Sequence, residues 1–452
     1  MKKLKERVFL LIVFTLAGAL WSPSAVCAGE ELTFWTTEVE KDRVDTQRDI
    51  AAGFEEKAGI SVKVVPVEEN MLPERVTAAY AAKSLPDVLY HPIDYTMGWA
   101  EAGILRPQWA TEVIRSLGEK TFGEGPLNLV VTDQGYAAVP IDGWSQLLLY
   151  RKDLFQKKGL AVPDRWETIF KAAEALHNPP QMWGCDLATD PGQTYTQQVF
   201  EHFALSNGVR LVGKDGKVCL NTPEMIETLQ FYKRLTQFGP PGNIYWLQTR
   251  MDYLSGRAAM IIWSAFILDE LSGLRKDQPV APDMAAGQPG FLAQNTGFVS
   301  AIQGPNGRAQ YGQANCLGIT VDADSEAAGK WIGYLLSDAY LHWLSMAAEG
   351  KLPVRKGTLE KPNCFVDGWR ELEFSVTSRV KISQFYGMDV VEIVTEGLEG
   401  FDRWGFVRGK GALISKVYGS KVVPELLKRF IDGEMSAEET AQRMEERIKA
   451  LE

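Results

Sequence analysis

Three strand-like segments separated by two helix-like segments follow residue 30, and this alternation constrains the fold more than any other feature. Residues 31–37, 61–67 and 87–90 have the apolar runs and the β-branched or aromatic content typical of strands. Between them, residues 43–58 place apolar side chains on one helical stripe that ends at Gly59, and residues 73–82 form an Ala-rich helix. This order predicts parallel α/β winding, in which ligands bind beyond the carboxyl ends of the strands.

The first 28 residues have the pattern of an export signal. A basic segment at residues 1–7 precedes an apolar run at residues 8–20, and Val26-x-Ala28 is a small-residue cleavage site. We therefore expect cleavage after Ala28 and a periplasmic mature chain. An uncleaved anchor is one alternative. Lipidation at Cys27 is another, which is disfavoured because Val26 stands where lipoprotein signals carry a small residue.

The length of 452 residues predicts two or three domains, and the 45% hydrophobic content is sufficient for a large core. Residues 1–28 carry four basic side chains and one acidic side chain, so the other 424 residues have a net charge of −13, against −10 for the whole chain. Nucleic acids and anionic membrane surfaces attract clustered Lys and Arg, so neither is an expected partner. No later segment reaches about 18 consecutive apolar residues, so we expect the exported body to be soluble.

Signatures of nucleotide, metal and hydrolase chemistry are incomplete. Residues 208–214 resemble a phosphate-binding loop until Asp215 stands where a hydroxyl group should reach Mg²⁺. Gly143-Trp144-Ser145 begins a nucleophile elbow, but Leu147 replaces the second glycine. The four histidines lack the spacing of metal ligands, so we expect no metal, no cofactor and no catalytic residue. The sequence allows zero, one or two disulfides among the cysteines of the mature chain, Cys185, Cys219, Cys316 and Cys364.

Aromatic side chains beside short polar residues, in segments expected to be turns or strand ends, are the most informative chemistry. Flat apolar rings stack on the C–H faces of sugars, and carboxylates accept hydrogen bonds from their hydroxyl groups. The alternative for each ring is packing in the core or between lobes. The rings concerned are Trp35, Tyr95, Trp144, Trp263, Phe266 and Trp404.

A series of short motifs runs through the mature chain in a fixed order. They are 32–35 (LTFW), 54–64 (FEEKAGISVKV), 79–88 (AYAAKSLPDV), 101–105 (EAGIL), 139–144 (VPIDGW), 149–155 (LYRKDLF), 256–260 (GRAAM) and 352–355 (LPVR). In this order, and behind an export signal, they resemble the extracellular solute-binding proteins of bacterial ABC importers, specifically the maltose-binding-like group that binds sugars and oligosaccharides.

The resemblance implies an α/β, two-lobe periplasmic-binding-protein fold of type II, with a mostly parallel sheet flanked by helices in each lobe. Residues 29–141 and 318–350 would form lobe 1, and residues 142–317 and 351–452 lobe 2. Extended segments at 139–146 and 314–319, with a further crossing near 351–355, suit hinge strands about which the lobes close on a solute. The resemblance also implies a monomer that delivers its solute to the transmembrane permease subunits of the importer.

We expect the solute to be a carbohydrate or a similar polyhydroxylated molecule. A charged metabolite such as a polyamine or a phosphorylated polyol is the first alternative, and an exported glycan hydrolase that uses a carboxylate pair is the second. Trp144 stands where maltose-binding relatives carry a carboxylate, so it either stacks on a sugar or fills the hinge. Aromatic rings would stack, Glu38 and Asp94 would accept hydroxyl hydrogen bonds, and Arg355 would bind bidentately. The candidate ligand-binding residues are Trp35, Glu38, Asp94, Tyr95, Trp144, Tyr195, Trp263, Phe266, Arg355 and Trp404.

Overall fold

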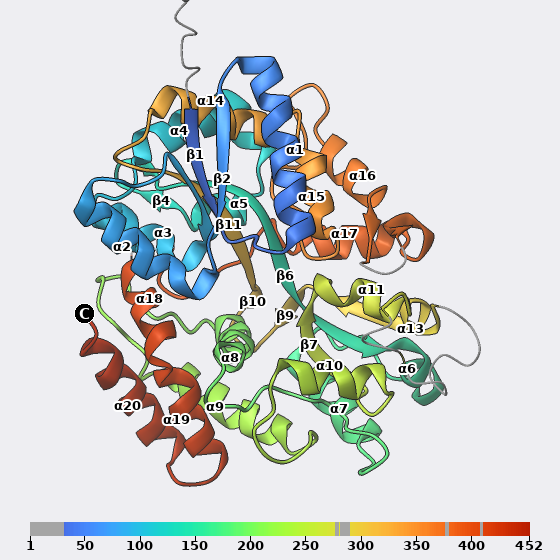
Figure 1. Ribbon diagram of the computed structural model, residues 1–452. Helices are drawn as coiled ribbons and strands as arrows, with labels where there is room; N and C mark the ends of the chain where they lie inside the picture. Colours follow the sequence, from blue (N-terminus) through green and yellow to red (C-terminus); the bar gives the residue numbers. More distant parts are fainter. Residues whose placement is uncertain (1–30, 276–279, 281–289, 376–378, 407–409) are drawn as a thin grey trace, which may run out of the picture.

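The computed structural model describes residues 31–275, 280, 290–375, 379–406 and 410–452. The export signal expected over residues 1–28, with Cys27, lies outside these ranges. The described chain forms an upper lobe and a lower lobe, named by their places in Figure 1, and strands pass between them. The two-lobe α/β architecture expected from the sequence is confirmed.

The upper lobe is built on a sheet with strand order β12-β6-β11-β3-β1-β2. β1 is parallel to β2 and β3, whereas β11 is antiparallel to β3 and β6, and β12 is antiparallel to β6. The sheet is therefore mixed rather than mostly parallel, because the strands that return from the lower lobe enter it in the opposite direction. The strands are β1 (Glu31–Thr36), β2 (Ser61–Pro66), β3 (Val88–Pro92), β6 (Val139–Arg151), β11 (Gly312–Ile319) and β12 (Leu352–Pro353).

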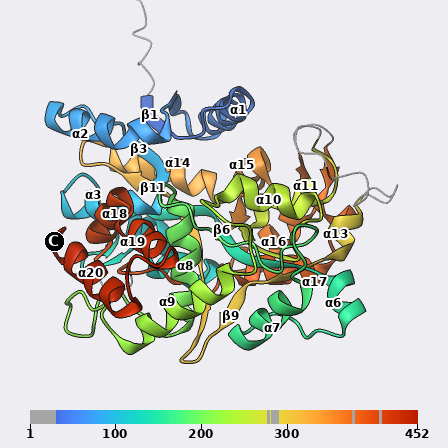
Figure 2. The same ribbon diagram turned by 90° about the horizontal axis from the view of Figure 1, so that it is seen from below.

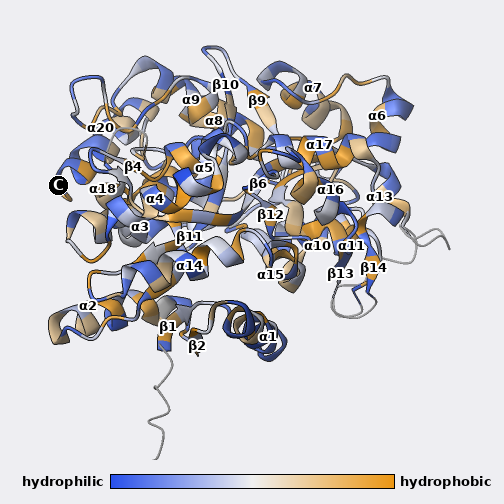
Figure 3. Ribbon diagram, turned by 90° about the horizontal axis from the view of Figure 1, so that it is seen from above, coloured by the Kyte–Doolittle hydropathy of each residue, from blue (hydrophilic) through white to orange (hydrophobic). Residues whose placement is uncertain are grey.

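Helices cover both faces of the upper sheet. In α1, Val44, Ile50 and Phe54 are buried on one stripe and Gly59 ends the helix at a φ of 73°, as the sequence predicts. The outer turns of α1 are hydrophilic (Figure 3). The elements are α1 (Lys41–Ala58), α2 (Leu72–Ala82), α3 (Ile93–Glu101), α4 (Pro107–Leu117), α5 (Glu124–Asn128), α14 (Ser325–Leu335), α15 (Tyr340–Leu344), α16 (Cys364–Arg370), α17 (Met388–Glu396), and the small ladders β4 (Val131–Thr132) with β5 (Gly135–Tyr136) and β13 (Glu373–Phe374) with β14 (Val380–Lys381).

Strand β6 belongs to both lobes. Its first half lies in the upper sheet, and its second half pairs antiparallel with β7 (Met260–Ser264) and β8 (Thr296–Val299) in the lower lobe. The sequence predicts an extended segment at residues 139–146, and the structure has one continuous strand that runs on to Arg151. Asp142 and Gly143 pair with β11 on one side and with β12 on the other, and this two-sided pairing keeps the segment extended.

The lower lobe consists mainly of helices around this short sheet. The sequence pattern of a helix start at Thr222-Pro223 and at residues 436–439 is confirmed, since Thr222 caps α9 and Ser436 caps α20, each by accepting a hydrogen bond from a backbone N–H of the first turn. α18 (Gly411–Ser420) packs against α3 and leads into α19 (Figure 2). The remaining elements are α6 (Lys152–Lys158), α7 (Trp166–Leu176), α8 (Thr194–Ser206), α9 (Pro223–Thr236), α10 (Trp246–Leu254), α11 (Leu268–Leu271), α13 (Phe291–Asn295), β9 (Ala301–Gln303), β10 (Arg308–Gln310), α19 (Val422–Ile431) and α20 (Ala437–Lys449).

The division of the chain between the lobes at residues 142, 318 and 351 stays a prediction. The apolar spacing of residues 325–344 predicts one long helix, but the structure has two helices there, α14 and α15. Among the described residues, no helix combines the length and apolar content needed to cross a membrane.

Gly143→Ala is expected to lower the free energy of unfolding by about 1–3 kcal/mol, as overpacking of a close contact does. A Cβ atom at position 143 would lie 2.4 Å from the backbone carbonyl oxygen of Gln313 in β11. Gly333→Ala in α14 is the control, because nothing lies within 4 Å of its Cβ position. Urea denaturation of both variants measures the difference, and equal stabilities would contradict the two-sided pairing of β6.

Candidate ligand-binding site

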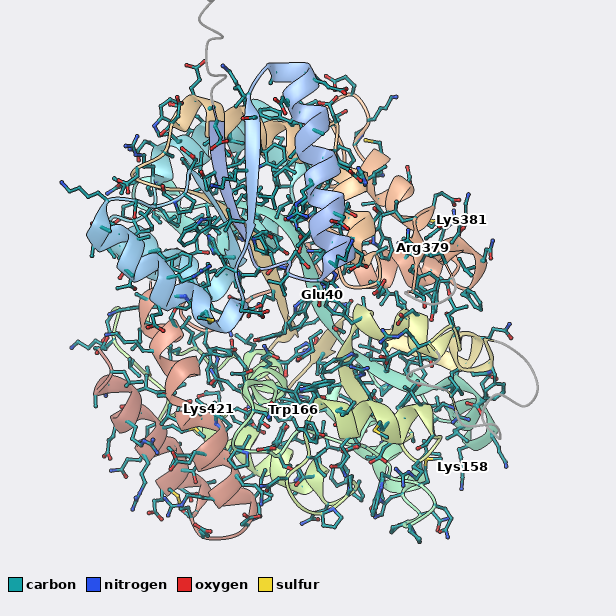
Figure 4. All side chains as sticks on the ribbon, viewed as in Figure 1. Glu40, Lys158, Trp166, Arg379, Lys381 and Lys421 are labelled. Carbon is teal, nitrogen blue, oxygen red and sulfur yellow. The ribbon has the colours of Figure 1, made fainter. Side chains whose placement is uncertain are left out.

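A cavity of about 820 Å³ lies between the lobes. The upper lobe contributes the start of α1 with the residue before it and the segment before β12, represented by Arg43, Glu40 and Glu349. The lower lobe contributes residues of α8, α10 and β7. Glu40 lies at the lower end of α1, at the level where the lobes meet (Figure 4). The volume is within the range of small-molecule sites, so the cavity is the candidate site.

Two tryptophans form the wall of the lower lobe. Trp246, the first residue of α10, and Trp263 of β7 are stacked with ring centroids 5.9 Å apart and an interplanar angle of 23°. The guanidinium group of Arg250, one helical turn after Trp246, lies 5.2 Å and 5.3 Å from the two ring centroids. Tyr195 meets Trp263 edge to face, with centroids 5.3 Å apart. The wall is therefore a rigid aromatic surface with one cation against it.

The charge of Arg250 is compensated within the wall. Its Nε donates to Glu270 Oε2 at 3.1 Å, and its Nη2 makes a second contact with Oε1. Burial raises the pKa of Glu270 to about 7, although Arg250 acts in the opposite direction. Because both partners are already engaged, Arg250 is held in place rather than free to take an anion.

The lobes touch at one edge of the cavity. The Phe266 ring packs against Gly350, where a Cβ atom would lie 1.7 Å from the ring atom Cε1. Only glycine permits this approach, so the contact fixes the segment that carries Glu349 relative to the lower lobe.

A buried cluster centred on Lys351 joins the strands that cross between the lobes. Lys351 Nζ lies 2.5 Å from Glu38 Oε1 and 3.1 Å from Asp142 Oδ2, and donates to the Tyr90 hydroxyl at 2.7 Å. Asp142 also accepts hydrogen bonds of 2.7 Å from Trp343 Nε1 and from the side-chain amide of Asn315. β6, β11 and the start of β12 thus meet at one cation and two carboxylates.

Glu38 connects this cluster to the cavity wall. Its second oxygen accepts a 2.7 Å hydrogen bond from Arg43, which lines the cavity. Burial alone would raise the pKa of Glu38, but Lys351 and Arg43 together lower it to about 2. Glu38 is therefore an anion at neutral pH, and both of its oxygens are occupied by cations.

Of the ten predicted ligand-binding residues, Tyr195, Trp263 and Phe266 line the cavity. Glu38 lies behind the wall, separated from the cavity by Arg43. For these residues and for the other six, contact with a solute stays a prediction.

Three other predicted residues lie near the ends of β1 and β3. The guanidinium group of Arg75 is 5.9 Å from the Trp35 ring centroid. Asp94 accepts a 2.9 Å hydrogen bond from Arg403 Nη2. Tyr95 stacks on Trp99, with centroids 5.2 Å apart.

The last three lie in the interior or at the hinge. Arg355 donates to the backbone carbonyl oxygens of Leu336 and Leu117 at 2.5 Å and 2.9 Å, so its guanidinium group is engaged. Trp404 is fully buried. Trp144, in the middle of β6, lies beside the Tyr311 ring at 6.4 Å between centroids.

Sequence reasoning missed several residues that line the cavity. Trp246 and Arg250 are spaced i, i+4 and therefore share a helix face, which is a signal that a helix assignment at residues 246–254 would have revealed. No local pattern marks Arg43, Glu270 or Glu349. The four cysteines are free thiols, and the described residues contain no His, Cys, Asp and Glu group suited to a metal ion.

Comparison with known proteins defines the class to which this architecture belongs. The family of bacterial extracellular solute-binding proteins matches residues 40–341. YcjN of Escherichia coli (strain K12), which carries the name of an ABC transporter periplasmic-binding protein, is 30% identical over 403 residues, 86% of this chain and 88% of YcjN. The mannitol-binding protein of Pseudomonas aeruginosa is 28% identical over 235 residues, 50% of this chain and 53% of that protein. The maltose-bound structure of Thermotoga maritima MalE3 superposes with a TM-score of 0.68 at 20% identity, covering 93% of this chain and all of MalE3.

The chain therefore belongs to the bacterial extracellular solute-binding protein family and is the solute-binding component of an ABC importer. Proteins of this family are non-enzymatic transport components, so the expectation that the chain is not an enzyme is confirmed on family grounds. The periplasmic-binding-protein fold is likewise confirmed by the match to MalE3.

Lys351→Met is expected to lower the free energy of unfolding by about 3–5 kcal/mol, because it leaves Glu38 and Asp142 buried with one cation fewer. Lys330→Met, which removes an exposed pair with Glu326 on α14, is expected to change it by at most about 1 kcal/mol. Chemical denaturation compares the two variants. A similar, small effect of both would show that the buried cluster does not stabilise the fold.

Acid is expected to weaken the fold partly through Glu38. Since its folded pKa of about 2 lies below its ordinary value of 4.5, Glu38 contributes stability above about pH 4.5 and loses that contribution as the pH falls toward 2. The stability difference between the wild type and Glu38→Gln should therefore shrink between about pH 5 and pH 2. Denaturation at several pH values tests this, and the exposed control Glu55→Gln should stay within about 0.5 kcal/mol of the wild type at neutral pH.

Proposed function

We propose that this protein captures a carbohydrate or a similar polyhydroxylated solute between its lobes and delivers it to the transmembrane permease subunits of the importer. The observation that carries the proposal is the stacked pair Trp246 and Trp263, which lines an interlobe cavity of about 820 Å³. Export through cleavage after Ala28 is part of the same proposal.

The cavity has the two kinds of surface that a sugar needs. Aromatic rings suit the C–H faces of a pyranose or of an extended polyol. Gln193 and Gln198 of the lower lobe and Glu349 of the upper lobe offer hydrogen-bonding groups to the same cavity. Such a division between flat apolar surface and a few polar groups is typical of sites that orient small polar ligands.

The named solutes of two similar proteins support the substrate class, whereas two other relatives are named for sn-glycerol 3-phosphate, a phosphorylated polyol. One relative is a mannitol-binding protein, and the MalE3 structure contains maltose. Both solutes are uncharged and carry many hydroxyl groups, so the same chemistry is proposed here.

Binding would also stabilise the closed arrangement of the lobes. A solute that contacts the Trp246 side of the cavity and the Glu349 side together has more contacts when the lobes are close, and this differential affinity shifts the population toward closure. The lobe division proposed from the sequence, at residues 142, 318 and 351, places the moving boundary at the crossing strands.

Mass spectrometry of the solute released from natively purified protein, followed by a thermal-shift screen of saccharides and polyols, tests the proposal. A bound solute at a hundredfold excess over its dissociation constant adds about 2.7 kcal/mol of stability. A released amine or organic acid, with no response to any saccharide or polyol, would refute the substrate class. Turnover of a glycan would refute the transport role.

Trp246→Ala is expected to weaken binding of the identified solute by at least about tenfold. The substitution removes a ring on which the solute would stack and the ring against which the Arg250 guanidinium group lies. Trp183→Ala is the matched control, since Trp183 lies in the same lobe but outside the cavity lining. Isothermal titration of both variants provides the comparison. Retention of full affinity by Trp246→Ala would place the site elsewhere.

A further inference from the structure

Glu349 is a buried carboxyl group in the cavity wall without a charged partner. It lines the cavity and is only 8% exposed, yet it makes no ion pair with any residue of the described ranges. It precedes Gly350, which is held against Phe266 of the lower lobe, and Lys351, which is anchored in the hinge cluster. The position of Glu349 is therefore fixed on both sides by contacts that bring the lobes together.

The arginines around the cavity are largely committed to other carboxylates. Arg43 is bound to Glu38, Arg250 to Glu270, and Arg275 lies 3.5 Å from Asp269. Each of these cations is compensated before a solute arrives, so none brings an uncompensated positive charge to the solute.

Glu349 remains at the cavity as a lining carboxyl group that no cation of the described residues pairs with directly. Glu349 interacts electrostatically with Asp269 across the gap between the lobes, and this repulsion together with burial raises the pKa of Glu349, while Arg43 and Arg275 act in the opposite direction. Asp269 is fully buried, and its Oδ1 has no hydrogen-bond partner within the described part of the chain. An ionised Glu349 carboxylate needs hydrogen-bond donors. A protonated Glu349 carboxyl group offers one donor but no positive charge.

The ionised state of Glu349 therefore favours a solute that carries hydroxyl groups and disfavours one that carries a phosphate or a carboxylate, and the protonated state supplies no positive charge that would compensate an anion. An anion placed beside Glu349 would lose its hydration and face a like charge at short range in a partly desolvated cavity, where Coulomb energies are large. Hydroxyl groups donate to the same carboxylate at no such cost.

Building on the proposed function, we propose that Glu349 makes the cavity selective for uncharged saccharides and polyols over their phosphorylated or carboxylated counterparts. Glu349 is then a specificity-determining residue, supplied by the segment that leads into the hinge strand β12. It acts on the solute when the Phe266–Gly350 contact is formed.

Arg379 argues in the other direction, since it lines the cavity and is exposed. It lies at the edge of the upper lobe next to Lys381 (Figure 4). Solvent and salt screen a charge in such a place. Arg379 therefore attracts anions toward the opening of the cavity but does not neutralise the negative charge of Glu349 within it.

Matched pairs of solutes test the proposal: mannitol with mannitol 1-phosphate, and maltose with maltose 1-phosphate. Isothermal titration of the wild type is expected to show at least about tenfold tighter binding of the uncharged member of whichever pair binds. Glu349→Gln, which keeps the shape and removes the charge, is expected to reduce this ratio by about tenfold. Glu326→Gln on the outside of α14 removes the same charge far from the cavity and should leave the ratio unchanged.

The outcomes separate this inference from the proposed function. Equal or tighter binding of a phosphorylated member, or a ratio unaffected by Glu349→Gln in a protein that unfolds as the wild type does, overturns the role of Glu349 while saccharide capture stands. If Arg379→Gln then abolishes binding of the phosphorylated member, Arg379 sets the selectivity instead. Absence of binding to both pairs, with a non-saccharide solute recovered from purified protein, overturns the proposed function and this inference together.

Discussion

The arrangement of the lobes depends on the ion pairs and the hydrogen bond that the ammonium group of Lys351 makes in the hinge. Burying a lysine to 3% exposure costs desolvation free energy. Here Glu38, Asp142 and the hydroxyl group of Tyr90 offset that cost. These partners come from segments that are far apart in the chain and converge only when the sheet is formed. The cluster therefore has one satisfactory geometry, and that geometry specifies how the crossing strands approach one another.

The cavity follows from this arrangement. Because Lys351 is held in the hinge, Gly350 is brought against Phe266 and Glu349 is turned toward the lower lobe. On the opposite wall, α10 presents Trp246 and Arg250 on one face, and Arg250 is locked by Glu270. Both walls are therefore ordered before a solute binds, which reduces the entropy that binding must overcome.

Local sequence patterns predicted many of the helices and strands and part of the candidate ligand-binding site. The stripe of α1, its end at Gly59 and the cap at Thr222 depend on neighbouring residues, so they were predictable. Trp263 and Phe266 were predicted because their rings stand beside short polar residues at an expected turn or strand end. Glu349 and Arg43 are ordinary charged residues in sequence, and their roles arise from neighbours hundreds of positions away. The continuation of the extended segment 139–146 to Arg151 was not predicted, because the pairing that holds β6 comes from strands far away in the sequence.

The continuity of β6 has a consequence for how the molecule denatures. One strand supplies hydrogen-bond partners to the sheets of both lobes, so the two sheets share one continuous backbone segment. The lobes are joined by shared backbone pairing rather than by a linker, and a register irregularity at Asn315 and Cys316 concentrates twist at that joint. Heating should then melt both lobes in a single cooperative transition, although each is large enough to resemble a separate domain.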